Sequence, residues 1–114
     1  MRGMNRVMLL GRVGAPLSQR RTRSGVMILE LRLATRRSDR GRDEVTDWHQ
    51  VRLWGTQAEQ CSAILQPGDP LAIEGQLRME SWIDSEGTTH QRAFIYGERA
   101  HLIAEPGGGG AQSG

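Results

Sequence analysis

The stretch Gln57-Ala58-Glu59-Gln60-Cys61-Ser62-Ala63-Ile64-Leu65-Gln66 differs in pattern from all the sequence around it. It contains no Gly, Pro or aromatic residue. Its apolar side chains fall on one face at helical spacing: Ala58, Cys61, Ile64 and Leu65. Pro67-Gly68 follows at once and ends the pattern. We therefore expect one short helix over residues 57–66, with Cys61 as a small core side chain.

The sequence on both sides of this helix is typical of β-strands. Apolar or alternating segments occupy residues 4–13, 26–35, 45–54, 70–82 and 90–103, with polar, glycine-containing turns at 20–25, 38–43 and 84–87. Strand count alone also fits a small SH3-like barrel. Three strands, one short helix and two further strands is the order of the five-stranded Greek-key OB barrel. The position of the helix therefore predicts an all-β OB fold.

Length and composition predict one globular domain. The chain has 114 residues, of which 37% are hydrophobic and 25% charged. We expect a domain over residues 1–104 and a flexible, glycine-rich tail over 105–114. No apolar run exceeds four residues, so neither a membrane span nor a secretory signal is expected. A single cysteine excludes an internal disulfide, and the predicted location is the reducing cytoplasm.

Charge is distributed unevenly along the chain. Residues 1–42 carry eleven arginines against two carboxylates, a balance of +9, whereas residues 43–114 have a balance of −7. This asymmetry suggests a polyanionic partner for the first part, unless the charges interleave in the folded chain. All fifteen basic residues are arginine, a side chain that suits phosphate binding and stacking on bases.

The third predicted strand has two unlike faces. Alternation places Trp48, Arg52 and Trp54 on one face and Val51 and Leu53 on the other. The apolar pair marks the core side, so the tryptophans and the arginine face solvent. Exposed aromatic rings beside arginines form a surface on which unpaired bases can stack. The alternative is that these tryptophans pack under a loop or at a subunit interface.

The fourth predicted strand repeats this pattern, with Leu77 and Met79 on one face and Arg78, Glu80 and Trp82 on the other. We therefore predict a non-enzymatic surface for single-stranded DNA, with no metal or other cofactor. Bases would stack on Trp48, Trp54 and Trp82, while phosphates would contact Arg52, Arg78, Arg36 and Arg37.

Several motifs in order resemble those of the bacterial single-stranded DNA-binding proteins over residues 4–104. They include Met4-Asn5-Arg6-Val7, Leu33-Ala34-Thr35, Thr46-Asp47-Trp48-His49, Leu53-Trp54-Gly55 and Ile73-Glu74-Gly75-Gln76-Leu77-Arg78 followed by Trp82. The resemblance implies an OB fold, usually a homotetramer, that wraps single-stranded DNA without sequence specificity in replication, recombination and repair. It implies stacking by Trp48, Trp54 and Trp82, basic contacts by Arg20 and Arg78, a subunit contact near His49, and a cytoplasmic, nucleoid-associated location.

The sequence departs from that family in three places. The turn between Thr35 and Thr46 is short and contains arginines but no aromatic residue. Glu80 and Ser81 stand where the family tends to be basic, so we expect weaker phosphate binding near Trp82. The tail as given lacks the family's acidic, Phe-terminated tip, so recruitment of replication and repair proteins through that tip is not expected.

Two rival functions fit parts of the sequence. An accessory protein of the same fold, similar to the primosomal replication protein, would act mainly by docking other proteins. A metal-dependent nuclease on an OB scaffold would use Asp43, Glu44, Asp47 and His49 as metal ligands, whereas solvated turn charges explain the same residues without a metal.

Overall fold

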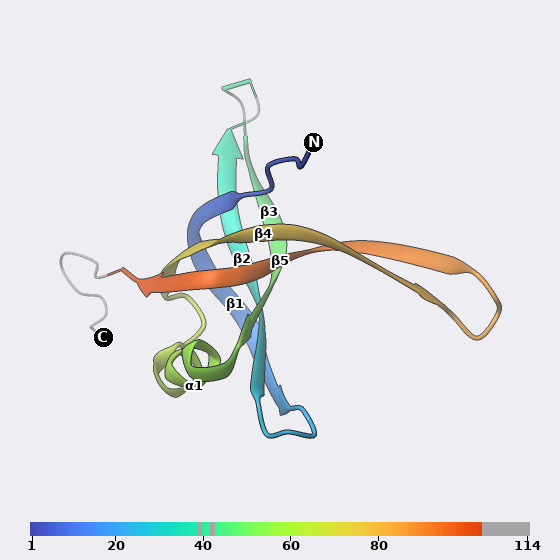
Figure 1. Ribbon diagram of the computed structural model, residues 1–114. Coiled ribbons are helices and arrows are strands. Elements are labelled where there is room, and N and C mark those ends of the chain that lie inside the picture. Colours follow the sequence, from blue (N-terminus) through green and yellow to red (C-terminus); the bar gives the residue numbers. More distant parts are fainter. Residues whose placement is uncertain (39, 42, 104–114) are drawn as a thin grey trace.

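The computed structural model describes residues 1–38, 40–41 and 43–103 (Figure 1). The predicted tail, 105–114, lies outside the described residues. The elements follow in the order β1 (Val7–Arg21), β2 (Met27–Ser38), β3 (Glu44–Trp54), α1 (Gly55–Ile64), β4 (Pro70–Ile83) and β5 (Thr89–Leu102). The strands close into a barrel in the order β1-β2-β3-β5-β4. This confirms the predicted all-β OB barrel with one helix between the third and fourth strands.

Alternation along the strands builds the barrel core. Leu29, Leu31 and Leu33 of β2 are at most 2% exposed, and Val51 and Leu53 of β3 are equally buried. These strands pair antiparallel with Leu31 opposite Val51, so their apolar side chains meet on one side of the sheet. The residues between them point outward, which fixes the position of the outer face.

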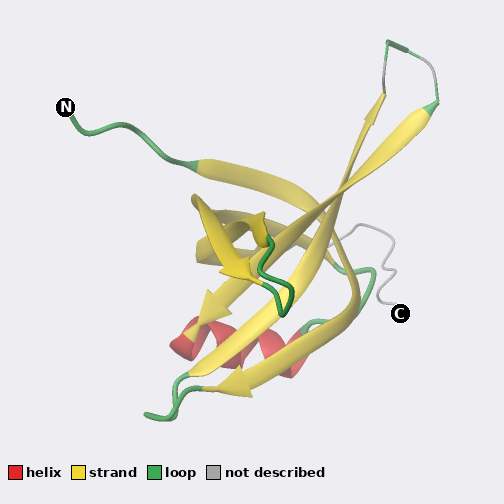
Figure 2. Cartoon of the chain, turned by 90° about the vertical axis from the view of Figure 1, so that its right-hand side faces the viewer, coloured by secondary structure: helices red, strands yellow, loops and turns green. Residues whose placement is uncertain are grey.

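Helix α1 closes one end of the barrel (Figure 2). It begins two residues earlier than predicted, at Gly55, whose φ of +66° suits glycine at the turn out of β3. Ala58 and Cys61 are buried, as predicted. Ile64 is 57% exposed, which contradicts its predicted core position. The chain leaves the helix at Leu65, whose extended backbone carries its side chain into the core instead.

Strand β1 is longer than predicted and spans the barrel. Its first half pairs with β4 from Val7 to Arg12, and its second half pairs with β2 as far as Arg21. A register shift between Gly14 and Ser18 interrupts the part that pairs with β2. Arg20 and Arg21 therefore lie on a strand, rather than in the turn predicted for residues 20–25.

The β2–β3 and β4–β5 hairpins extend beyond the barrel and diverge from each other (Figure 1). Strands β3 and β5 pair in parallel at only two positions, Val51 with Ile95 and Arg52 with Tyr96. Strand β4 continues to pair with β5 as far as Ile83 and Thr89. The outer face therefore continues from β3 onto the β4–β5 hairpin.

The described residues contain no helix long and apolar enough to span a membrane.

Candidate nucleic-acid interface

Trp48 lies flat across the outside of the barrel. Its side chain starts on β3 opposite Ala34 of β2 and reaches Gly14 of β1, where a β-carbon would overlap with the indole ring. The Arg32 guanidinium lies 4.4 Å from the centre of the same indole, and its Nη2 donates a 3.0 Å hydrogen bond to the carbonyl of Ala15. Trp48 remains 48% exposed. It therefore presents an oriented aromatic surface to solvent.

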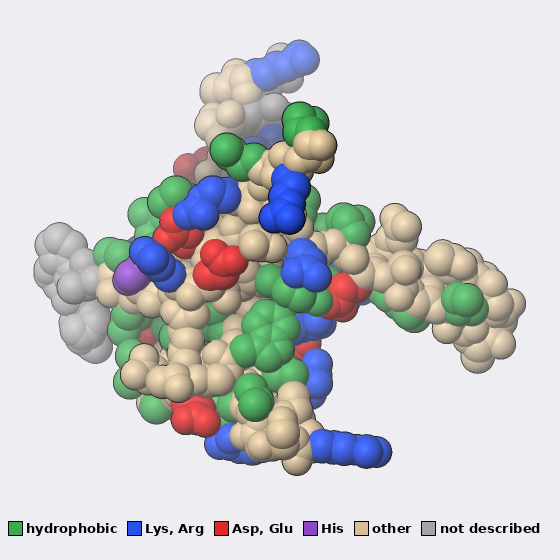
Figure 3. Space-filling model, viewed as in Figure 1, with side chains coloured by type: hydrophobic (Ala, Val, Ile, Leu, Met, Phe, Trp, Pro, Cys, Tyr) green, Lys and Arg blue, Asp and Glu red, His purple; other side chains and the backbone are tan. Residues whose placement is uncertain are grey.

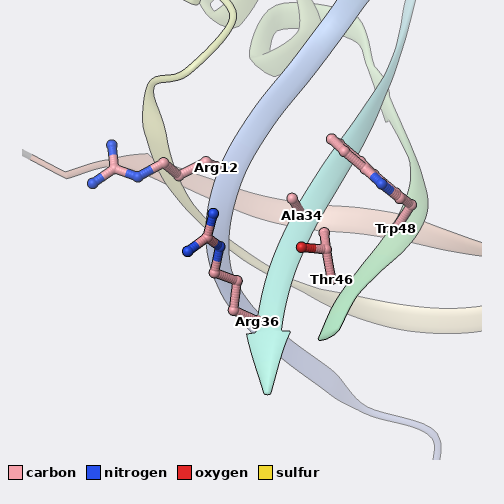
Figure 4. A pocket seen from close by; sticks show the side chains of 5 residues that line it. All are labelled: Arg12, Ala34, Arg36, Thr46 and Trp48. Carbon is pink, nitrogen blue, oxygen red and sulfur yellow. The ribbon is translucent and has the colours of Figure 1, made fainter. Parts of the chain in front are cut away.

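A hollow of about 430 Å³ lies beside this indole (Figure 4). Arg12 of β1 and Arg36 of β2 line it together with Trp48, and the small side chains of Ala34 and Thr46 form its floor. An aromatic ring and two guanidinium groups around one hollow suit a nucleotide, which carries both a base and a phosphate.

Arg52 lies on the outer face as its strand parity requires, but two carboxylates hold it. Its Nε lies 2.6 Å from Glu30 Oε2, and its Nη1 donates a 2.6 Å hydrogen bond to Glu80 Oε2. The side chain is only 13% exposed, and its guanidinium lies 4.2 Å from the centre of the Phe94 ring. Burial disfavours the charged form, but the carboxylates, Glu30 foremost, still raise the pKa of Arg52. The structure thus presents Arg52 as an ion-paired group rather than an open phosphate ligand.

Glu80 accepts hydrogen bonds from two neighbouring side chains. The Tyr96 hydroxyl donates a hydrogen bond to Glu80 Oε2, which also accepts the bond from Arg52. These contacts, that of Tyr96 first, lower the pKa of Glu80. The same bond raises the pKa of Tyr96. Weaker phosphate binding is predicted near Trp82 on the ground that an unpaired carboxylate repels phosphate. Glu80 is bonded to Arg52 and Tyr96, so this ground does not hold.

Trp54 and Arg78 both contact Tyr96. The Trp54 and Tyr96 rings meet edge to face, with centroids 4.7 Å apart and an interplanar angle of 61°. The guanidinium of the exposed Arg78 lies 4.8 Å from the centre of the Tyr96 ring. Tyr96 therefore joins a residue of β3 to a residue of β4.

Trp82 lies on the projecting β4–β5 hairpin and is 44% exposed. It stacks on His90, directly opposite on β5, with ring centroids 5.4 Å apart and an interplanar angle of 19°. His90 Nε2 lies 2.7 Å from Asp84 Oδ2, and Asp84 Oδ1 accepts bonds from two backbone amides of the turn. The Arg92 guanidinium lies 5.7 Å from the centre of the Trp82 ring. The turn thus orients the indole through His90.

The other three predicted arginines lie on the surface beside carboxylates. Arg36 Nη1 is 2.9 Å from Glu44, and Arg37 Nε is 2.9 Å from Asp47, both at the β2–β3 hairpin. Arg20 lies 3.7 Å from Glu30. All three side chains are more than half exposed, so these pairs are weak and can exchange a carboxylate for a phosphate.

Three of the four suggested metal ligands have other contacts. Glu44 and Asp47 pair with Arg36 and Arg37, and His49 Nε2 lies 2.9 Å from the Thr35 hydroxyl. Within residues 1–38, 40–41 and 43–103, no three His, Cys, Asp or Glu side chains group closely enough to hold a metal ion.

Five residues of this interface were not among the predicted site residues: Arg12, Arg32, Arg92, Phe94 and Tyr96. The signal for the last two is the same alternation that identifies Trp48 and Trp54. Ile95 is buried, so Phe94 and Tyr96 on either side of it point outward. Trp54, Tyr96, Phe94 and Trp82 form one row along β5 and the β4–β5 hairpin, whereas Trp48 lies outside this row, six residues before Trp54 on β3.

Charges interleave over the molecule. In the space-filling view, arginine side chains lie beside carboxylates across the face shown (Figure 3). The uneven charge along the sequence is therefore partly balanced in space, notably where Arg6 and Arg21 of the basic part meet Glu74 and Glu59 of the acidic part. The face is distinguished by its aromatic rings with adjacent arginines rather than by a field of one sign.

Comparison with known proteins agrees with this geometry. The model of the single-strand binding protein family matches residues 4–103. The chain is also 35% identical over 115 aligned residues to "Single-stranded DNA-binding protein 1" of Chlorobaculum tepidum, an alignment that covers 96% of this chain and 71% of that relative. The barrel, the row of aromatic residues and both matches lead to one conclusion: the chain belongs to the single-strand binding protein family.

Proposed function

We propose that this protein binds and protects single-stranded DNA without sequence preference during replication, recombination and repair, and that it does so as a binding protein rather than an enzyme. The observation that carries the proposal is the oriented, half-exposed indole of Trp48 beside Arg12 and Arg36. Stacking is sequence-tolerant because every base has a π-face. Family membership supports the same function.

Each predicted site residue has a part in this proposal. Trp48, Trp54 and Trp82 stack on bases along the outer face. Arg20, Arg36, Arg37 and Arg78 contact phosphates, the first three after their carboxylates are displaced. Arg52 acts as a positioning residue, since its two ion pairs hold Glu30 and Glu80 and its guanidinium supports the Phe94 ring.

Titration with oligo-dT tests the proposal, with tryptophan fluorescence as the readout at low and at high salt. All three tryptophans of the chain belong to the proposed surface. Stacking quenches their emission, and because stacking does not depend on counterion release, quenching that persists at high salt supports base contact. Absence of binding at both salt concentrations would refute the proposed function.

Conservative variants separate stacking from charge. Trp48→Phe keeps an aromatic ring, whereas Trp48→Leu removes it, and only the second should lose affinity by about 1–3 kcal/mol. Binding that vanishes with salt and leaves the fluorescence unchanged would instead favour the accessory protein that docks other proteins.

We also propose that several copies assemble, with a homotetramer as the expected state and the cytoplasmic nucleoid as the location. Met8 and Leu10 of β1 are 75% and 64% exposed on the side where β1 pairs with β4. They line an apolar hollow of about 320 Å³ with Ala72 and His101. A second copy is the occupant that this proposal assigns to that face. Light scattering should give a smaller assembly for Leu10→Asp than for wild type, and an unchanged mass would contradict the assignment.

A further inference from the structure

We propose that Phe94 and Tyr96 of β5, with Arg78 over the Tyr96 ring, form a further subsite for an unpaired nucleobase between Trp54 and Trp82. This inference rests on the proposed DNA-binding function. It adds two residues that lie between the tryptophan sites and extends the stacking surface onto the β4–β5 hairpin.

The position of the two rings supports this subsite. Phe94 and Tyr96 are two residues apart on β5, so both point outward and repeat at about 6.8 Å along the strand. Tyr96 contacts Trp54 at one end of the pair. At the other end, Arg92 and His90 follow on the same face of β5 and contact Trp82. A DNA strand that crosses from Trp54 to Trp82 therefore passes over Tyr96 and Phe94.

Both rings are oriented before any ligand arrives. The Tyr96 hydroxyl is bound to Glu80, and its ring meets Trp54 edge to face. Phe94 is held by the guanidinium of Arg52, which is itself fixed between Glu30 and Glu80. Since little side-chain freedom remains to be lost, a base that stacks here has a small ordering cost.

Arg78 is the movable part of the subsite. Its guanidinium lies over the Tyr96 ring, where a base would stack, and no carboxylate of the described residues pairs with it. A cation–π contact at an exposed position is weak. An incoming base can therefore take the place of the guanidinium on Tyr96, while Arg78 swings to the phosphate of the same nucleotide.

Variants of Tyr96 and Phe94 test the subsite through the affinity for oligo-dT. Tyr96→Leu and Phe94→Leu each remove a ring and should weaken binding about five-fold or more. Tyr96→Phe is the matched comparison, because it keeps the ring and loses only the bond to Glu80, so it should lose less affinity than Tyr96→Leu. Thermal unfolding of each variant separates lost binding from lost folding.

Photocrosslinking of the wild-type protein gives an independent test. Trypsin cleavage after Arg92 and Arg99 releases the peptide 93–99, which contains both rings and no tryptophan. An oligonucleotide with 5-iododeoxyuridine should crosslink to this peptide, as identified by mass spectrometry. DNA binding by wild type without that crosslink, and with unchanged affinity in both leucine variants, would overturn the subsite alone. Failure of the wild type to bind DNA would overturn the proposed function and the subsite together.

Discussion

The indole of Trp48 occupies the space that a side chain at position 14 would fill. Gly14 lies on β1 and Trp48 on β3, and the ring crosses the intervening β2 to reach the glycine. Arg32, the partner of Gly14 across the strands, lies over the same indole. The absence of a side chain at one residue thus orients the most exposed of the three tryptophans.

Gly14→Ala should therefore weaken DNA binding. A β-carbon at this position displaces the Trp48 ring, which can rotate toward solvent because it is half exposed. We expect a loss of about 1 kcal/mol of binding free energy for oligo-dT, near five-fold in affinity. Gly3→Ala is the control, since nothing lies within 4 Å of a β-carbon at residue 3. In a Trp48→Leu background, Gly14→Ala should cause little further loss, and fully additive losses would contradict this mechanism.

Arg52 and Arg78 should respond differently to replacement by leucine. Arg52→Leu leaves Glu30 and Glu80 close together without their shared cation, and should lower the free energy of unfolding by about 1–3 kcal/mol. Arg78→Leu should change stability little, but should reduce the log–log salt dependence of DNA binding by about 0.7. Urea unfolding and salt titrations measure the two effects. If Arg52→Leu were as stable as wild type and reduced the salt slope, Arg52 would be a phosphate ligand instead.

Stability should depend on pH through the bond between Tyr96 and Glu80. The pKa of Glu80 lies below its ordinary 4.5, so its contribution is present above that pH and is lost as the pH falls through the lowered value. The pKa of Tyr96 lies above its ordinary 10.0, so its contribution is present below pH 10 and is lost as the pH rises through the raised value. The stability difference between wild type and Tyr96→Phe should therefore be largest near neutral pH and shrink at both extremes.

Urea unfolding of both proteins at about pH 3, 7 and 11 measures that difference. Tyr96 is the only tyrosine, so the ultraviolet absorbance of tyrosinate follows its ionisation directly. A stability difference that stays constant over the whole range would show that the Glu80 bond has no part in it.

Alternation explains why so much of the fold could be predicted from the sequence. Each strand of a barrel buries one face, so Val51 and Leu53 identify the core side of β3 and leave Trp48 and Trp54 outside. The same period reaches Phe94 and Tyr96 through the buried Ile95. The spacing of apolar residues within one element predicts nothing beyond the end of that element. Ile64 is exposed because the chain turns out of α1 at Leu65.

The local sequence pattern does not show which residues of distant strands lie side by side. Arg52 is ion-paired because Glu30 of β2 and Glu80 of β4 meet it on the closed barrel, 22 and 28 residues away in sequence. Strand parity gives the face of a residue but not its neighbours on that face. The charge state of the predicted site therefore depends on the barrel register, which only the structure supplies.

The arginines of the β2–β3 hairpin should set the salt dependence of binding. Arg36 and Arg37 form exposed ion pairs with Glu44 and Asp47, and such pairs contribute only about 0–1 kcal/mol each. Phosphate can therefore replace the carboxylates at little cost. Arg36→Ser and Arg37→Ser should each reduce the log–log salt slope of oligo-dT binding by about 0.7, while the unfolding free energy stays nearly unchanged.

Replacement of the paired carboxylate gives a control of opposite sign. Glu44→Gln removes the competitor of Arg36 without touching the arginine, so affinity at low salt should rise rather than fall. In an Arg36→Ser background that rise should be smaller, because part of it depends on the freed guanidinium. If Glu44→Gln weakened binding, the pair would instead hold the hairpin in its binding geometry, and Arg36 would act through Glu44 rather than on phosphate. The sign of this one change thus decides between a phosphate ligand and a positioning pair.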